Sequence, residues 1–366
     1  MSLNRRDFLG LSGAGVASLF LHRALAANLV SAPSKSLLSE LPRGDQRIAL
    51  ISDLNSSYGS TSYVSQVHRG LELLIKLQPD LVLCAGDMGA GQKLGLTSNQ
   101  LDAMWSAFDE QILQPLRTVE ESFAPTMGNH DASNSRGHSG YVFELDRLHA
   151  QKFWRARQGS LGLTFVDAHQ FPFRYSIRHG EIFVLFVDAS SANVSADDWA
   201  WAESQLDGSE ARQAKLRLMM GHLPPYAIAK GRNRAGEVLH EPKRLQQLLL
   251  RKNVDLYISG HHHAWYPSRV GSANLLSLGA MGSGPRQRLN DRIPPQQTVT
   301  LLDLFSQQGE LVETTIELDG LQVLPAQLLP SSLQPSVGPR IDLRSTRVNL
   351  NKNQLPTKKG FRLKHN

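Results

Sequence analysis

Aspartate, asparagine and histidine residues recur directly after the short apolar runs of this sequence. In chain order they are Asp53, Asn55, Asp87, Asn129, His130, His222, His261 and His263. Each one alone has an ordinary explanation, because aspartate often caps a helix, asparagine often sits in a turn, and a lone histidine is commonly a hydrogen-bonded core or surface residue. Independent accidents would not select one end of successive apolar runs. The group as a whole therefore indicates a shared site.

Carboxylate, carboxamide and imidazole groups are suitable ligands for Mn, Fe or Zn ions. The single cysteine, Cys84, lies in the run DLVLCAGD, where we expect a buried and unreactive thiol, so an internal disulfide and a cysteine-based zinc site are excluded. Two divalent cations about 3.5–4 Å apart can share one carboxylate and one hydroxide. With Asp53 and Asp87 ionised and hydroxide bound, such a centre keeps one positive charge, which suits an anionic phosphate ester.

Apolar strands that alternate with amphipathic helices are expected to position these side chains. The sequence predicts strands over 48–52, 81–85, 123–127, 182–187, 216–220 and 256–259. It predicts helices over 63–78, 99–117, 196–206 and 240–252, followed by a hairpin over 297–320. This alternation is typical of a sheet covered by helices on both faces, in which functional groups collect outside the carboxyl ends of the strands.

The order D-x-N, GD, GNHD, H and GHHH resembles the calcineurin-like metallophosphoesterase superfamily, whose motifs are usually written D-x-H, GD, GNH(D/E), H and GHxH. The resemblance covers residues 47–285, and the stretches VDAS, DDWAWAESQL and LSLGAMGSG agree with it. It implies an α/β fold with a two-sheet, β-sandwich-like core flanked by helices, in four α/β/β/α layers.

The resemblance also implies a role for each residue. Asp53 and His263 would hold a first metal ion, Asp87 would bridge both ions, and the second ion would be completed by Asn129, His222 and His261. His130 would face the substrate and either stabilise the charged transition state or protonate the leaving oxygen. His262 would be a neighbour without a ligand role, and Asp131 would orient His130 or cap the next turn. The implied reaction is attack of metal-bound hydroxide on phosphorus, without a covalent enzyme intermediate.

Asn55 departs from the family pattern, which usually has histidine at this position. Three outcomes follow: Asn55 moves in and binds the first metal ion directly, a water molecule bridges the gap, or another group substitutes. Tyr58, Tyr63 and His138 are the candidate substitutes. The tyrosine that purple acid phosphatases supply three residues after the bridging aspartate is replaced here by Ala90. Asparagine in place of histidine at position 55 leaves the charge of the centre unaltered, so this substitution points to altered metal preference or affinity.

The two ends of the chain differ from the middle. Residues 1–27, with Arg5-Arg6 before a Gly- and Ala-rich apolar run and the small residues ALAA, resemble a twin-arginine export signal, and an amphipathic N-terminal helix is the alternative. We expect a linker over 28–46 and a metallophosphoesterase domain over 47–319. A Pro-rich segment and a basic tail follow over 320–366, with the uncharged residues 320–339 extended over the domain or leading out of it.

The formal net charge of +6 arises at the ends of the chain. From residue 340 onward, eight lysines and arginines stand against one aspartate. Such a tail is either solvated or makes weak contact with an anionic membrane, and nothing indicates sequence-specific binding of nucleic acid.

These observations predict an exported phosphoesterase, periplasmic or extracellular, that uses two divalent or trivalent ions of Mn, Fe or Zn. Its substrate would be a phosphomonoester or a phosphodiester, and its partner in export would be the twin-arginine machinery. The alternative is a catalytically degenerate member of the same fold that binds metal without efficient hydrolysis. Metal content and turnover of a generic phosphate ester distinguish the two.

Overall fold

The computed structural model describes residues 41–117, 122–282 and 284–350. The unit that begins at Pro42 is built around two β-sheets. The first sheet consists, in spatial order, of β15 (Gln322–Val323), β14 (Glu310–Glu317), β13 (Thr298–Phe305), β1 (Gln46–Ile51), β2 (Leu81–Cys84) and β3 (Ser122–Pro125), and β18 (Arg347–Asn349) pairs with β14. The second sheet consists of β16 (Ser332–Leu333), β17 (Ile341–Leu343), β11 (Tyr266–Val270), β12 (Ala273–Ser277), β10 (Leu256–Ser259), β9 (Leu216–Met220), β8 (Ile182–Phe186), β7 (Arg174–His179) and β6 (Thr164–Gln170). A small separate hairpin joins β4 (Arg136–Gly137) and β5 (Gly140–Tyr141).

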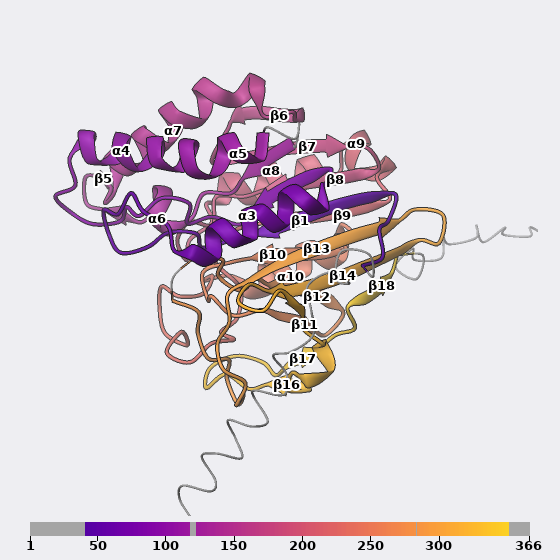
Figure 1. The fold of residues 1–366 in the computed structure, drawn as a ribbon. Helices are drawn as coiled ribbons and strands as arrows, with labels where there is room; N and C mark the ends of the chain where they lie inside the picture. The colour runs from indigo at the N-terminus through magenta and orange to yellow at the C-terminus, as the bar shows by residue number, and fades with distance from the viewer. Residues whose placement is uncertain (1–40, 118–121, 283, 351–366) are drawn as a thin grey trace, which may run out of the picture. The chain divides into compact units, whose positions relative to one another are not determined.

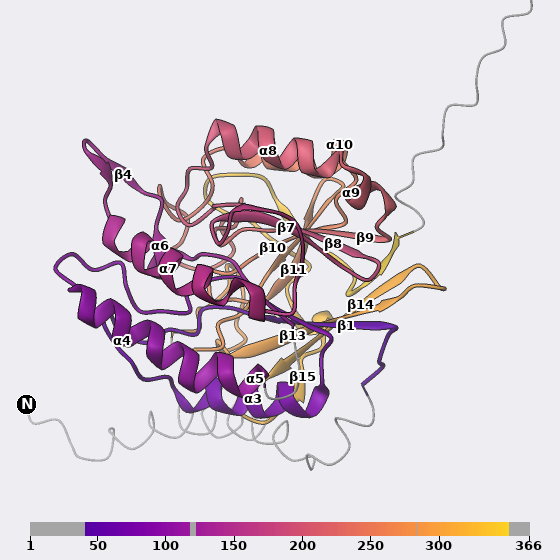
Figure 2. The same cartoon turned by 90° about the horizontal axis from the view of Figure 1, so that it is seen from above.

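Helices surround the two sheets, and one short helix directly follows β3 at the predicted site. They are α3 (Ser65–Leu77), α4 (Ser98–Phe108), α5 (Gln114–Arg117), α6 (Asn129–Ala132), α7 (Glu144–Arg157), α8 (Ala196–Leu206), α9 (Ser209–Gln213) and α10 (Pro242–Arg251), with a π-helical turn at Asp109–Leu113 and 3-10 turns at Gln158–Ser160 and Ala326–Leu328. Seen from above, α3, α4 and α5 lie along one side of the strands and α8 and α10 along the opposite side (Figure 2). The predicted α/β fold with two sheets and flanking helices is therefore confirmed (Figure 1).

Parallel pairing brings the carboxyl ends of several strands to one edge. In the first sheet β1, β2 and β3 run parallel, and in the second sheet β8, β9 and β10 do so. These are the six strands that the apolar runs predict. Every residue of β2, β8 and β10 is buried, as is typical of strands covered on both faces. Cys84 is buried in β2, and burial raises the pKa of its thiol, in agreement with the expected unreactive role.

The C-terminal part of the described chain joins both sheets. β17 pairs with β11 of the second sheet, and β18 pairs with β14 of the first. Between them Arg344 is buried, and its guanidinium donates to the Glu313 carboxylate at 2.6 Å. Glu313 also accepts a hydrogen bond from Trp265 Nε1 at 3.0 Å. Residues 341–349 are thus an integral part of the sheets.

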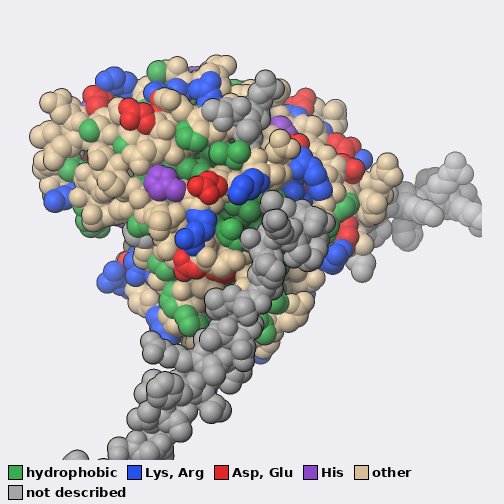
Figure 3. Space-filling view, in the orientation of Figure 1, with side chains coloured by type: hydrophobic (Ala, Val, Ile, Leu, Met, Phe, Trp, Pro, Cys, Tyr) green, Lys and Arg blue, Asp and Glu red, His purple; other side chains and the backbone are tan. Residues whose placement is uncertain are grey.

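No helix of the described residues is long and apolar enough to cross a membrane. The proposed signal over 1–27 and the basic residues after 350 lie outside the described residues. In the face shown by Figure 3, acidic and basic side chains are interspersed.

Candidate metal centre

The loops that follow the parallel strands bring the predicted ligands together. Asp53 follows β1, Asp87 follows β2, and Asn129 begins the short helix α6 after β3. His222 follows β9, and the three histidines at 261–263 follow β10. Two sets of side chains have ligand atoms within 4.8 Å of one another, Asp87 with His222 and His261, and Asp53 with Asp87 and His263. Asp87 belongs to both sets, as a bridging ligand would.

Around Asn129, several acceptor atoms converge. Its Oδ1 lies 2.9 Å from His222 Nε2 and 2.8 Å from His261 Nδ1. His222 Nε2 also lies 3.2 Å from Asp87 Oδ2. The other ring nitrogen of His222 lies 2.7 Å from the backbone oxygen of Ala85, so a neutral His222 that donates there presents a lone pair to the oxygens of Asn129 and Asp87. Facing lone pairs need a proton or a metal ion between them, so this donor set fits a divalent metal ion that takes the place of a proton on His222.

The same pattern recurs at Asp53. His263 Nε2 lies 3.2 Å from Asp53 Oδ1, and His263 Nδ1 lies 2.8 Å from the backbone oxygen of Gly284. Asp53 itself accepts hydrogen bonds from Ser52 Oγ at 2.7 Å and from the backbone N–H of His261 at 3.1 Å. These partners orient the carboxylate and the imidazole toward the shared Asp87. The assignment of metal ligands stays a prediction, with a geometry that suits it.

The electrostatics of the site follow from burial and close partners. Burial acts to raise the pKa of Asp87, but the neighbouring His222 and His130 outweigh it and hold that pKa well below its usual range. The pKa of Asp53 is lowered in the same way, because the nearby His263 outweighs the effect of burial. Burial acts to lower the pKa of His222, but Asp87 outweighs it and raises the value to about 9. His261 behaves oppositely, because burial lowers its pKa to about 4 despite the hydrogen bond to Glu237.

Backbone conformation at the site departs from the ordinary range. Asp53, Asp87, His261 and His263 all have positive φ, with values of 54°, 57°, 64° and 52°. Such conformations are costly for residues with a Cβ and cluster at functional sites. At Gly86, where φ is 101°, an added Cβ would lie 2.7 Å from Gly128 N and from His222 Nδ1. The glycine of the GD motif is therefore required by its conformation and by close packing.

His130 and Asp131 have different roles in the structure. The His130 ring lies beside the metal ligands, with Nδ1 3.2 Å from the backbone oxygen of Gly91 and Nε2 4.0 Å from Asp87 Oδ2. Asp131 accepts backbone hydrogen bonds from the Asp87 loop and from Gly128, at 2.7 to 2.9 Å. Of its two predicted roles, Asp131 thus caps the turn that begins α6, while Gly91 holds the His130 ring.

Asn55 is nearly buried, with 5% of its surface exposed, and it borders the cavity of the site. Its backbone N–H donates to the backbone oxygen of Asp87 at 3.1 Å. Of the three candidate substitutes, Tyr58 lines the same cavity, and its ring lies 5.0 Å from that of His130. Tyr63 donates its hydroxyl to the backbone oxygen of Met88, and His138 lies in the turn of the β4–β5 hairpin.

The cavity has a volume of about 540 Å³ and contains residues that the sequence did not single out. Glu237 Oε2 lies 3.0 Å from His261 Nε2, and Gln92 Oε1 accepts from Asn129 Nδ2 at 2.5 Å. The backbone oxygen of Glu237 also lies 2.9 Å from Nε2 of the buried His262, consistent with a neighbour role for that residue. Neither Glu237 nor Gln92 follows a strand or belongs to a motif, so the sequence carries no signal for them. A second cavity of about 590 Å³, bordered by Asn134 and Asp188, has none of the predicted ligands in its wall.

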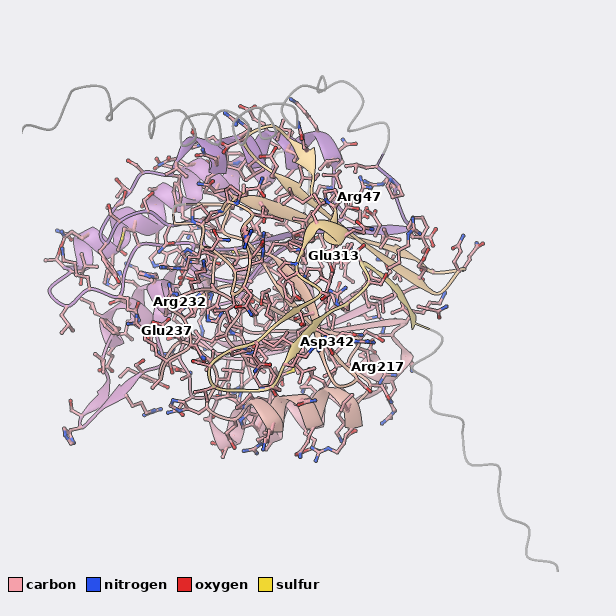
Figure 4. All side chains as sticks on the ribbon, turned by 90° about the horizontal axis from the view of Figure 1, so that it is seen from below. Arg47, Arg217, Arg232, Glu237, Glu313 and Asp342 are labelled. Atoms are coloured by element: carbon pink, nitrogen blue, oxygen red, sulfur yellow. The ribbon has the colours of Figure 1, made fainter. Side chains whose placement is uncertain are left out.

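Three further residues of the wall are arginines. Arg232 and Arg234 come from the loop between β9 and α10, and Arg286 comes from the loop between β12 and β13. Arg232 and Arg234 both pair with Glu237. Figure 4 labels Arg232 and Glu237, which lie close together.

Comparisons with known proteins agree with this fold. No curated protein matches the chain. A purple acid phosphatase from yellow lupin (Lupinus luteus) seeds is similar in structure, with a TM-score of 0.58 and 15% identity over 76% of this chain and 52% of that chain. A dimetal phosphatase from Danio rerio has a TM-score of 0.50 and 13% identity over 77% of this chain and 98% of that chain. At these identities the likeness concerns the fold, and this chain spans about half of the lupin protein.

A family comparison goes further than the fold. The model of the calcineurin-like phosphoesterase family matches residues 46–265, which include Asp53, Asp87, Asn129, His222 and His263. Because this match covers more than half of the chain, the protein belongs to the calcineurin-like phosphoesterase family.

Proposed function

We propose that this protein holds two metal ions side by side and hydrolyses phosphomonoesters or phosphodiesters. The observation that carries the proposal is that Asp87 belongs to both candidate ligand sets. Bound there, two ions of Mn, Fe or Zn would supply positive charge and an acidified water molecule for attack on phosphorus. Asp53, Asn129 and His222 belong to the proposed ligands, and each of these side chains is oriented by a hydrogen bond of its own.

His130 is suited to the departure of the leaving group. Its Nδ1 is held by the Gly91 oxygen, and the ring lines the cavity on the side of Asp87. In the imidazolium form, Nε2 carries a proton that the leaving oxygen can take up. Asp87 Oδ1 accepts a hydrogen bond from the backbone N–H of His130 at 2.8 Å, and this bond fixes the main chain that carries the ring.

Elemental analysis and turnover test this function. We expect about two metal ions per chain, and hydrolysis of 4-nitrophenyl phosphate or bis(4-nitrophenyl) phosphate after reconstitution with Mn, Fe or Zn. The Asp87→Asn variant should lose both ions' tight binding and its turnover, whereas Glu203→Gln, a surface change on α8, should keep both. One tightly held ion without turnover of either ester would favour the degenerate, metal-binding alternative.

Export is the second part of the proposal. Arg5-Arg6 and the apolar run after them support passage through the twin-arginine machinery into the periplasm or beyond the cell. Replacing both arginines with lysine should leave the protein in the cytoplasmic fraction, and an unchanged distribution would reject the signal.

We also propose weak contact of the basic tail with anionic membranes. Because residues 341–349 pair with both sheets, the deletion that tests this contact starts at residue 351. Removal of 351–366 should reduce partitioning onto anionic vesicles, and an unchanged partition would exclude the contact.

A further inference from the structure

Three arginine side chains border the cavity beside both candidate ligand sets. Arg232 and Arg234 are linked through Glu237 to His261 of the second set. Arg286 lies at the first set, because its backbone N–H donates to the backbone oxygen of His263 at 3.0 Å. A phosphoryl group bound between the two sets would therefore have guanidinium groups on one side.

The cavity wall carries more positive than negative charge here. Glu237 is shared by two guanidinium groups and the His261 imidazole. Arg232 is largely buried, with 14% of its side chain exposed, and Arg286 is half-buried. Arg232 and Arg234 share one carboxylate and Arg286 lies in the same wall, so the positive charge left over can be balanced by a further anion.

Two of these arginines also have unsatisfied polar atoms. The Nε atoms of Arg232 and Arg286 are buried and have no hydrogen-bond partner in the described part of the chain. Buried donors are nearly always paired, so such atoms call for an explanation. The Nε and Nη groups of arginine form a planar fork that matches the oxygens of a phosphate. A phosphate group at this wall would balance the charge of Arg232, Arg234 and Arg286 and accept hydrogen bonds from their guanidinium groups, and the two buried Nε atoms would take part once their side chains turn toward it.

We propose that Arg232, Arg234 and Arg286 form a subsite for a second phosphoryl group of the substrate, so that the preferred substrates are phosphoanhydrides such as nucleoside diphosphates. This inference rests on the proposed function, because it assigns the first phosphoryl group to the metal centre. The cavity of about 540 Å³ falls within the range of sites that enclose small organic ligands. In the reaction, water adds across the P–O–P link: a new P–O bond forms at the attacked phosphorus, the bridging P–O bond breaks, and the leaving oxygen takes up a proton.

The contribution of the proposed subsite is measured by comparing substrates that have one or two phosphoryl groups. The metal-loaded protein is assayed with adenosine 5′-diphosphate, adenosine 5′-monophosphate and 4-nitrophenyl phosphate, and kcat/KM is compared. We expect the diphosphate to be favoured over the monophosphate by about 10- to 100-fold, the factor given by one or two charge-assisted hydrogen bonds. Arg286→Gln and Arg232→Gln should each reduce that ratio to less than about threefold, with Arg286→Lys intermediate. Arg251→Gln, at an arginine on the surface of α10 that pairs with Glu203, should keep the full ratio.

A binding measurement separates this inference from the proposed function. Calorimetry compares adenosine 5′-(α,β-methylene)diphosphate with adenosine 5′-monophosphate, and metal content and melting temperature show that each variant is folded and loaded. If the protein turns over no ester but binds the diphosphate analogue about tenfold more tightly, and Arg286→Gln loses this advantage, the subsite stands and the proposed function fails. If monoesters are hydrolysed but diphosphate and monophosphate are treated alike in both assays, the subsite is wrong and the proposed function stands.

Discussion

Replacing Glu237 with glutamine tests how the protein would hold the second of the two proposed metal ions. Glu237 Oε2 lies 3.0 Å from His261 Nε2, and both side chains are almost buried, with 11% and 8% exposed. When His261 binds a cation through Nδ1, its single proton must lie on Nε2, where the Glu237 carboxylate accepts it. Glutamine keeps the size of the side chain and one oxygen, and it removes the negative charge.

The expected loss is about 10- to 100-fold in affinity for the second ion, which corresponds to about 1.4–2.7 kcal/mol. Burial strengthens the contribution, because a hydrogen bond to a charged acceptor is stronger away from water. Competition with protons does not explain such a loss. The pKa of His261 is lowered to about 4, so the ring is neutral at pH 6 to 8 with or without the carboxylate. The ratio of affinities should therefore stay constant across this pH range.

Competition with a chromogenic chelator measures the two affinities separately. In the Glu237→Gln variant the affinity for one ion should fall, while the affinity for the other should stay within about threefold of its original value. Glu203→Gln serves as the control, because this surface glutamate pairs with Arg251 and Lys252 far from any predicted ligand. Unchanged affinity for both ions would refute the role of Glu237. An equal loss for both ions together with a lower melting temperature would show that Glu237 acts on the fold of its loop instead.

Three further predictions concern His222, Asn55 and Arg344. The pKa of His222 is raised from 6.5 to about 9, so it stabilises the metal-free fold fully below pH 6.5, and up to about 3 kcal/mol of that stability is lost as the pH rises through 9. Urea denaturation of the metal-loaded protein, whose His222 must be deprotonated, should show no such loss between pH 6.5 and 9, and equal slopes for the two forms would contradict this. Asn55→His should tighten the first ion by at least about tenfold in the chelator assay, and weaker binding would show that Asn55 is itself the better ligand here. Arg344→Met leaves Glu313 buried without its cation and should cost about 3–5 kcal/mol of unfolding free energy, which the Arg344→Met/Glu313→Leu double variant should largely restore.

The sequence predicts those elements whose pattern is uniform along their length. Strands β2, β8 and β10 are apolar throughout because both of their faces are buried. The predicted single helix over 99–117 is instead α4 and α5 separated by the π-helical turn at Asp109–Leu113. Pro115 lacks an N–H and crowds the preceding turn, and the π-helical turn accommodates it.

Helix α7 and strand β6 were not predicted, because their apolar residues do not form one face. In α7 the polar residues Asp146, Arg147 and His149 are buried, whereas Leu148 is 54% exposed. Strand β6 is half-exposed at the sheet edge, and two irregularities interrupt its pairing with β7. The strict alternation that identifies a strand in sequence is lost at such irregularities.

At the site, sequence reasoning singled out residues that follow strands, which the fold brings together, and missed the residues that contact them. Asp53, Asp87 and His222 were found because parallel strands place their ends together. Glu237 and Gln92 act through His261 and Asn129 from loops, and only the folded chain brings them into contact. A sequence motif can therefore identify a candidate ligand, but the contacts that orient its side chain depend on the tertiary structure.

The two ligand sets differ in the length of one donor side chain, and this difference gives Asn55 its importance. In the second set each donor is fixed by its own partner, Asn129 by Gln92, His222 by Ala85 and His261 by Glu237. In the first set Asp53 and His263 are fixed in the same way, and beside the shared Asp87 the remaining donor would be Asn55, whose side chain is shorter than the histidine of the family pattern. A metal ion that one donor reaches less closely is released first on dilution or chelation, because each weakened bond removes part of its binding free energy. The first ion should therefore be the exchangeable one, and the identity of residue 55 then sets how readily the centre is emptied.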